Sequence, residues 1–339
     1  MRRNTIWIGL SLGLLTTVLT TTLLAGKPGE DRQQYRPHER AAEAELMATR
    51  IWLGTTSTSW ATTTNWSGTT VPIDGDTVVV PATASNHLLT NLDRTGDTAG
   101  AGLHLAAFRR LADSTVKVGD STNPLKCTAT LVRDEGATDF YFQSGTGTSP
   151  TNKTTRCIIN PSNTGAIIQI GSKAVTGADN ITRLELLAGT VSLVPAVANG
   201  IIATEVFMVP IGPFDLRVTQ ENGARWVYCN MAGGELTGTY ASIMRQSGGT
   251  VTINQASGVS GNVNEYYQFG GTSELSISAA ATTPTGDAEL WIIGGRCAIE
   301  GSPYGNSIVG FIYVSPNAEY DEGQYVAYTG VGLVELGEE

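Results

Sequence analysis

Downstream of about residue 50, hydrophobic residues occur in short runs that glycine and small polar residues separate. Thr77–Val80 is a continuous β-branched run, and Lys126–Arg133 and Asp139–Gln143 follow a two-residue period. Shorter apolar pieces lie at His87–Leu92 and Ser114–Val118. A two-residue period is typical of half-buried strands, and this part of the chain carries no long 3.6-residue period. The pattern therefore predicts an all-β protein built from short strands.

A repeated phrase appears from about residue 180, in which one or two glycines precede an alternating strand. It occurs at Ala188–Val194, Gly233–Gly238, Gly248–Ile253, Gly270–Ile277 and Gly294–Ile299. The glycine next to the strand stands at positions 189, 234, 249, 271 and 295. The first interval between these glycines is therefore about twice as long as each of the last two intervals. Imperfect recurrence at this length is typical of a solenoid, in which each unit is one coil stacked on the last.

Stacking also predicts where the side chains of this repeat point. The glycines are expected at the corners of the coils, where φ is often positive. Between the corners, Val251 with Ile253 and Leu275 with Ile277 are expected to face inward, because alternate residues of a strand lie on opposite faces.

A solenoid has an open strand edge at each end, and an open edge invites aggregation unless it is covered. The stretch 47–81 contains three of the six tryptophans and then a Pro-x-x-Gly-Asp turn. We predict that this stretch is an N-terminal cap. Its structural residues would be Trp52, Trp60, Trp66, Pro72, Gly75 and Asp76. The aromatic-rich end, 310–339, is predicted to form C-terminal strands, a second cap or a subunit interface.

The first 46 residues form a leader. Arg2 and Arg3 precede an apolar run from Ile6 to Gly26, which has the order of a signal peptide or membrane anchor. An alternative is that Met47 begins the folded domain and the leader lies outside the packed body. Between the cap and the C-terminal strands, residues 82–309 are predicted to be the solenoid body.

Composition and charge restrict the possible partners. Of the 339 residues only 15% are charged, and 40 are glycines. This balance is typical of β-rich surface proteins rather than helical ones, which need charged residues on their wet faces. The formal net charge is −10. An acidic body lacks the Lys and Arg that neutralise phosphates, so we expect no nucleic-acid partner.

The four cysteines lie inside strand-like runs, at Cys127, Cys157, Cys229 and Cys297. Their spacing contains no Cys-x-x-Cys pair, which argues against zinc. We expect buried free thiols, because free cysteine packs as a small hydrophobic residue. One or two disulfides are the alternative and would imply an oxidising compartment.

The order Trp52…Trp60…Asn65-Trp66-Ser67…Pro72-x-x-Gly75-Asp76-x-Val78-x-Val80 resembles the opening of many β-helical proteins. Proteins of this kind occur in tailed-phage virions and among bacterial surface and autotransporter-like adhesins. The matching motif covers about 30 of the 339 residues. The resemblance implies a right-handed parallel β-helix and supplies no catalytic residues. The compact size resembles a phage structural protein, whereas the apolar leader resembles an exported surface protein.

Candidate catalytic groups are few. His87 and His104 are the only histidines after residue 46, and both are expected to be packing or surface residues. Acidic residues cluster in two places. Some β-helices cleave polysaccharides with a pair of carboxylates, so these clusters are candidate catalytic groups. Solvated charge beside a turn is the simpler interpretation. The clusters are Asp134, Glu135 and Asp139, and Asp287 with Glu289.

Two aromatic pairs could stack on a sugar. Trp226 with Tyr228 are two residues apart in one predicted strand, and Tyr266 with Tyr267 are adjacent in another. Alternation places the first pair on one face and separates the second pair. Core packing is the alternative for all four.

These patterns favour a non-enzymatic structural or surface protein, without cofactor or metal. We expect a phage virion component such as a head (capsid) decoration, fibre or tail protein. The alternatives are a cell-surface adhesin or carbohydrate-binding protein anchored by its leader, and a polysaccharide lyase or hydrolase. The expected partners are further copies of the chain, for instance in a trimer, other virion or envelope proteins, and carbohydrate. The expected location is the virion or the exported cell surface.

Overall fold

The computed structural model describes residues 48–95, 102–145, 153–172, 181–195, 200–211, 214–221, 224–238, 241–254, 263–276, 289–299, 307–322 and 326–335. They form strands β1 to β22 and two short 3-10 helices, which confirms the all-β prediction. The leader 1–46 lies outside the described residues, as do Ile277 and Asp287.

The strands are short, and turns or loops join them. In chain order they are β1 Thr49–Ile51, β2 Thr77–Val80, β3 His104–Arg110, β4 Leu125–Asp134, β5 Phe140–Ser144, β6 Thr154–Ile159, β7 Ile167–Ser172, β8 Ile181–Leu186, β9 Gly189–Pro195, β10 Ile201–Met208, β11 Leu216–Gln220, β12 Arg225–Met231, β13 Glu235–Gly238, β14 Ala241–Gln246, β15 Thr250–Asn254, β16 Val263–Gln268, β17 Thr272–Ser276, β18 Glu289–Ile292, β19 Gly295–Ile299, β20 Ser307–Val314, β21 Ala318–Glu322 and β22 Val326–Glu335. The 3-10 helices η1 and η2 are Thr63–Asn65 and Ser67–Thr69.

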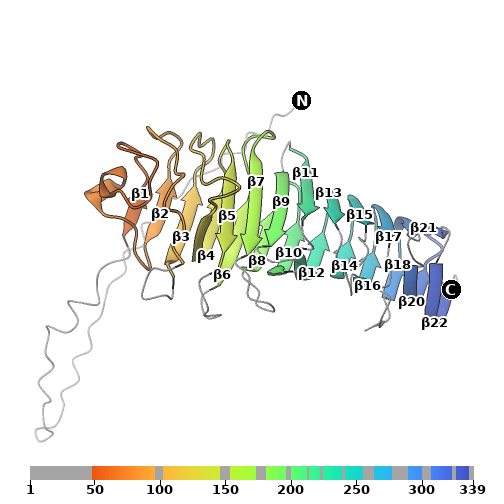
Figure 1. Ribbon diagram of the computed structural model, residues 1–339. Coiled ribbons are helices and arrows are strands. Elements are labelled where there is room, and N and C mark those ends of the chain that lie inside the picture. The colour runs from red at the N-terminus through yellow and green to blue at the C-terminus, as the bar shows by residue number, and fades with distance from the viewer. Residues whose placement is uncertain are drawn as a thin grey trace, which may run out of the picture. The chain divides into compact units, whose positions relative to one another are not determined.

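The strands form two parallel ladders, so the fold is a parallel β-solenoid (Figure 1). The first ladder contains β1, β2, β3, β4 and then the even-numbered strands up to β22. The second ladder begins with the first residues of β4 and continues through the odd-numbered strands from β5 to β21. From β4 onward, each coil thus adds one strand to each ladder.

The register of the second ladder reproduces the glycine rhythm of the sequence. Its successive partners Glu235, Thr250, Thr272 and Arg296 each directly follow the second glycine of a phrase. The long first interval is two coils of unequal length, because Thr190 pairs with Arg217 and Arg217 with Glu235. The solenoid prediction is therefore confirmed, coil by coil, from residue 189 onward.

The core is made of rows of inward side chains that stack along each ladder. Val251, Ile253 and Leu275 are all buried, as alternation predicts. Fully burying one such side chain stabilises the fold by about 1.5–3 kcal/mol. The central row of the first ladder is Val78, Phe108, Val132, Cys157, Leu184, Val206, Cys229, Met244, Tyr266, Leu290 and Ile312.

Two predicted strands near the N-terminal end are shorter than expected. Within His87–Leu92 and Ser114–Val118, single bridges join Leu88 to Val118 and Val118 to Phe140, in line with the second ladder. The backbone explains the difference, because Asn91 and Gly119 have positive φ angles and end the extended conformation soon after each bridge.

The glycine corners form a column in which no side chain fits. Gly249, Gly271 and Gly295 have φ angles of 78°, 82° and 79°. A Cβ on any of them would press against the carbonyl oxygen of the preceding glycine in the column. Glycine is therefore required at these positions for two reasons: the backbone is left-handed, and successive coils approach each other closely.

Replacing Gly271 with alanine is expected to lower the free energy of unfolding by about 2–4 kcal/mol, because strain in φ and overpacking add. Gly68→Ala is a matched control, since Gly68 has a φ of 73° but its Cβ would meet nothing closer than Arg50 Nη1 at 3.6 Å. The control should lose about 1–2 kcal/mol from φ alone. If urea unfolding showed the same loss of free energy of unfolding for both variants, the close stacking of the glycines would contribute nothing to stability.

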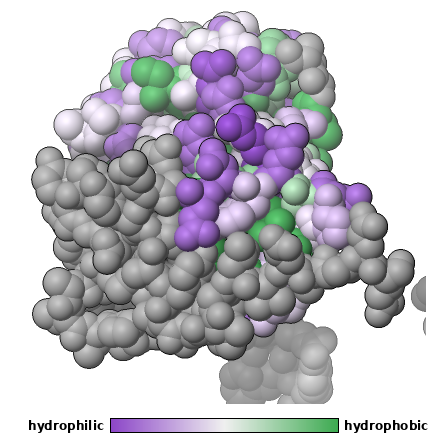
Figure 2. Space-filling view, turned by 90° about the vertical axis from the view of Figure 1, so that its right-hand side faces the viewer, coloured by the Kyte–Doolittle hydropathy of each residue, from purple (hydrophilic) through white to green (hydrophobic). Residues whose placement is uncertain are grey.

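At the C-terminal end, β21 pairs with β19 and β22 with β20, and neither pairs with another strand of the described chain. Figure 2 faces the side on which β21 and β22 lie in Figure 1 and shows hydrophilic residues gathered there. On β21, Glu319, Asp321 and Glu322 are exposed. Acidic side chains on an edge strand oppose the addition of a second, equally acidic edge.

Candidate functional site

The three tryptophans of the predicted cap form one buried cluster. Trp52 and Trp60 are fully buried and Trp66 is 1% exposed. Trp66 packs edge-to-face on both partners, with ring centroids 5.0 Å from Trp52 and 4.8 Å from Trp60. Its indole N–H donates to the Trp60 carbonyl oxygen at 2.7 Å. No face of this cluster is open to a ligand, so its chemistry is that of a core.

The same segment covers the outer edge of β1. The Ile51 N–H donates to Ser67 Oγ at 2.8 Å, and the Leu53 N–H donates to the Asn65 carbonyl oxygen at 2.7 Å. The Trp52 N–H points the other way and donates to Val79 on β2. The outward amide of Ile51 at the end of β1 and that of Leu53 just after it, which would otherwise offer an open edge, are therefore satisfied within the chain.

The remaining cap residues hold the turn that leads into β2. Pro72 is buried, and Gly75 has a φ of 80°. The Asp76 carboxylate accepts hydrogen bonds from the Ala48 and Ile73 N–H groups and from Arg50 Nε, at 2.9–3.1 Å. This carboxylate therefore ties the start of β1 to the turn before β2.

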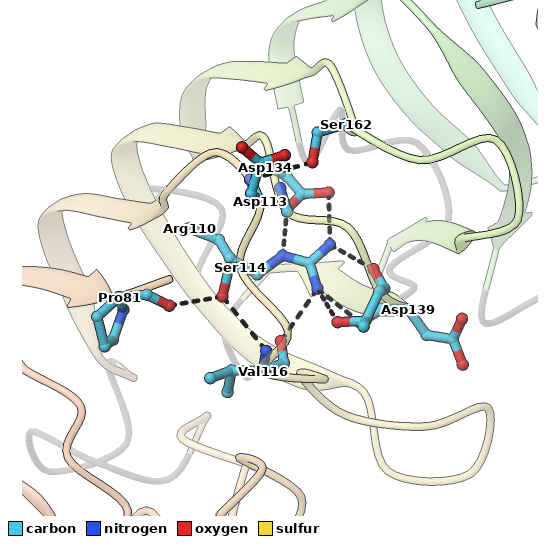
Figure 3. A network of polar contacts seen from close by, with 10 residues as sticks. Pro81, Arg110, Asp113, Ser114, Val116, Asp134, Asp139 and Ser162 are labelled. Carbon is cyan, nitrogen blue, oxygen red and sulfur yellow. Dashed lines mark hydrogen bonds and ion pairs between the residues drawn. The ribbon is translucent and has the colours of Figure 1, made fainter. Parts of the chain in front are cut away.

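The first acidic cluster does not form a catalytic pair. Asp134 and Arg110 are fully buried neighbours in the first ladder, and both carboxylate oxygens accept from the guanidinium (Figure 3). The same guanidinium donates to the carbonyl oxygens of Val116, Thr138 and Asp139. The expectation of a solvated charge is wrong for Asp134, because the register places it opposite Arg110 inside the coil.

Electrostatics agree with a structural role for this pair. Burial raises the pKa of Asp134 above its ordinary value, and the Arg110 charge opposes that shift. A Cβ at Gly136 would collide with the guanidinium, so the chain passes close over the pair. A substrate cannot reach a carboxylate that is fully buried and engaged on both oxygens.

The other acidic candidates each have a different neighbour. Asp139 forms an ion pair with Lys117 at 2.9 Å, and Glu135 pairs with Arg133. Burial raises the pKa of Asp139, but the hydrogen bond from Ile167 N–H and the Lys117 charge outweigh it and lower that pKa. Glu289 lies on the outer face of the first ladder next to Glu265. The described residues contain no group of three His, Cys, Asp or Glu side chains that could hold a metal ion.

The histidines have ordinary structural contacts. His104 Nδ1 lies 2.9 Å from Thr128 Oγ1 on the next coil, and His87 Nδ1 accepts from the Lys117 N–H at 3.2 Å.

The four aromatic candidates separate into two sets. Trp226 and Tyr266 are buried, at 2% and 0% exposure, so they cannot stack on an external ligand. Tyr228 is 44% exposed. The two-residue alternation of β12 is interrupted at Val227 and Tyr228, neither of which is buried, so Trp226 and Tyr228 do not share a face. The paired strand β10 is interrupted in the same way at Thr204 and Glu205.

Tyr267 begins an aromatic stack on the outer face of the first ladder. Its ring lies 6.2 Å from that of Trp291, which lies 3.9 Å from that of Tyr313, with angles of 13° and 15° between planes. Arg245 lies over the Tyr267 ring at 5.9 Å. The faces of these rings pack against one another, so we interpret the stack as a stabilising aromatic ladder rather than a surface on which sugars stack.

A hollow of ≈ 180 Å³ lies on the outer face of β10, β12 and β14. It is lined by Glu205, Tyr228, Cys229, Asn230, Ile243 and Arg245. The register explains it, because Asn230 stands between Phe207 and Arg245 in one outward row and is much shorter than either. Of these residues the sequence pattern predicts only Tyr228 as a ligand contact. The others come from three coils, and only the strand register brings them together.

All four cysteines are free and buried, which confirms the prediction of core thiols. Burial raises the pKa of Cys127 and Cys229 to about 12 and that of Cys297 to about 11. Burial also raises the pKa of Cys157. The folded chain therefore keeps neutral, unreactive thiols at neutral pH.

Two results follow from these shifts. A thiol reagent at pH 8 should label the native protein negligibly and label four thiols after denaturation.

Because unfolded thiols ionise near pH 9 while folded ones stay protonated to about 11, stability from these groups is present below pH 9 and falls as pH rises above it. Rapid labelling of the native protein, or stability that rises from pH 9 to 10.5, would contradict buried thiols.

Comparisons with known proteins leave the family open. No family model, no curated protein and no solved structure matches the chain. Among the described residues, none lies in a helix long and apolar enough to cross a membrane.

Proposed function

We propose that this protein is a non-enzymatic structural or surface protein, and within that class a virion component such as a head decoration, fibre or tail protein. The observation that carries the proposal is the closed N-terminal edge of the solenoid. The hydrogen bonds of Ile51 and Leu53 to Ser67 and Asn65 favour a finite scaffold that is not extended by strand addition at this end.

The interior polar groups support the same proposal. Gln246 and Gln268 are fully buried, and each amide donates to a carbonyl of its own coil and to one of the next. Together with Arg110 and Asp134, they fasten consecutive coils to each other. Side chains used in this way make a rigid scaffold whose outer faces are free for contacts with other molecules.

The experiment that tests the non-enzymatic proposal is a broad screen of polysaccharides with the purified full chain. We expect no cleavage, detected as new reducing ends or unsaturated products. Cleavage would overturn the proposal, and Glu135→Ala, Asp139→Ala and Glu289→Ala would then show whether the remaining described acidic candidates carry the activity.

A cell-surface adhesin or carbohydrate-binding protein is the second candidate. The exposed Tyr228 at a polar hollow favours it. Location separates the two candidates, because an adhesin would be found in the cell envelope with residues 1–46 attached. In either setting we propose that the chain assembles with copies of itself.

A further inference from the structure

The hollow beside Arg245 differs from other polar parts of the solenoid, because its polar side chains have no hydrogen bond or ion pair to other described residues. Elsewhere on this face, Arg156 and Arg183 both bind the Glu185 carboxylate. Within the described part of the chain, no hydrogen bond or ion pair engages the side chains that line the hollow. These side chains are Glu205, Tyr228, Asn230 and Arg245.

Arg245 lies beside an aromatic ring. Its guanidinium lies over the Tyr267 ring, 5.9 Å from the centroid, and Tyr267 is the first ring of the aromatic stack. The N–H groups of a guanidinium lie in its own plane, where they can donate two parallel hydrogen bonds to a carboxylate.

The other groups in the hollow complement a sugar ring. Glu205 accepts hydrogen bonds, and the Asn230 amide both donates and accepts, as sugar hydroxyls do. Tyr228 is 44% exposed and, with Ile243, offers apolar surface to the C–H face of a ring. A hollow of ≈ 180 Å³ is large enough for one sugar ring.

We propose that this hollow binds a single sugar residue that carries a carboxylate, such as a uronic acid at the end of a glycan. Arg245 binds the carboxylate, Glu205 and Asn230 bind hydroxyls, and Tyr228 packs on the ring. The proposal does not depend on whether the protein belongs to a virion or a cell surface, so a failure here leaves the proposed structural function standing.

The test uses the full chain and three probes: methyl glucuronide, methyl glucoside and acetate. Titration followed by NMR or calorimetry should detect methyl glucuronide and show much weaker binding of the other two. Arg245→Gln should weaken methyl glucuronide binding by on the order of tenfold, since a hydrogen bond to a charged group is lost. Arg109→Gln is the matched control, because Arg109 is an exposed arginine in the same outward row.

A second variant fills the hollow without removing a charge. Asn230→Tyr places a large ring between Phe207 and Arg245 on a face that tolerates aromatics, and it should abolish binding while the thermal midpoint is kept. Binding of methyl glucoside or acetate as strong as that of methyl glucuronide would overturn the assigned ligand class. Absence of methyl glucuronide binding, or full binding by Asn230→Tyr, would overturn the site.

Discussion

Replacing Asp134 with asparagine is expected to lower the free energy of unfolding by about 3–5 kcal/mol, the loss typical of a buried ion pair from which one partner is removed. Arg110 itself is unchanged by this substitution. It would keep its carbonyl partners at Val116, Thr138 and Asp139 but lose its counter-charge inside the coil. Urea unfolding at pH 7 measures the change.

The matched control for that experiment is an exposed ion pair. Lys126 and Asp93 lie 3.0 Å apart with side chains 27% and 53% exposed. Lys126→Gln should change the free energy of unfolding by less than about 1 kcal/mol, because water screens such pairs. A loss for Asp134→Asn no larger than that of the control would mean that the buried pair does not hold the coils together.

Replacing Trp66 with alanine is expected to destabilise the protein by about 3–5 kcal/mol and to cause aggregation. The ring fills the space between Trp52 and Trp60, and its loss frees the segment that satisfies the outer amides of β1. Thermal unfolding measures the first effect, and light scattering at increasing concentration measures the second.

Trp291→Ala is the control for Trp66→Ala, because Trp291 stacks on the outer face between Tyr267 and Tyr313 and covers no strand edge. This variant should stay soluble and lose less stability. If the Trp66→Ala protein were stable and soluble but had lost binding to a ligand of the native protein, this result would contradict the structural role and indicate that the tryptophan cluster is a binding site.

The solenoid could be predicted because its repeat is local in the sequence. Each Gly-Gly-strand phrase contains both the corner and the inward residues of one coil, as Gly249, Val251 and Ile253 illustrate. The same reasoning holds for the cap, in which Trp52, Trp60 and Trp66 are close together in the sequence and pack on one another.

The polar sites could not be predicted because they depend on register between coils. Asp134 is buried because it pairs with Arg110 on the preceding coil, and no local pattern marks that pairing. Trp226 is buried and Tyr228 is exposed because the alternation of β12 is interrupted between them, and no local pattern marks that interruption. The hollow likewise needs Asn230 opposite Arg245 across neighbouring coils.

The proposed virion role is tested most directly by locating the native chain. Virions and the envelope fraction of the native host would be separated on a density gradient, and the chain would be identified in each by mass spectrometry of its peptides. We expect the chain to band with the virions and its first peptide to begin at Met47. Recovery in the envelope fraction with residues 1–46 attached would contradict it.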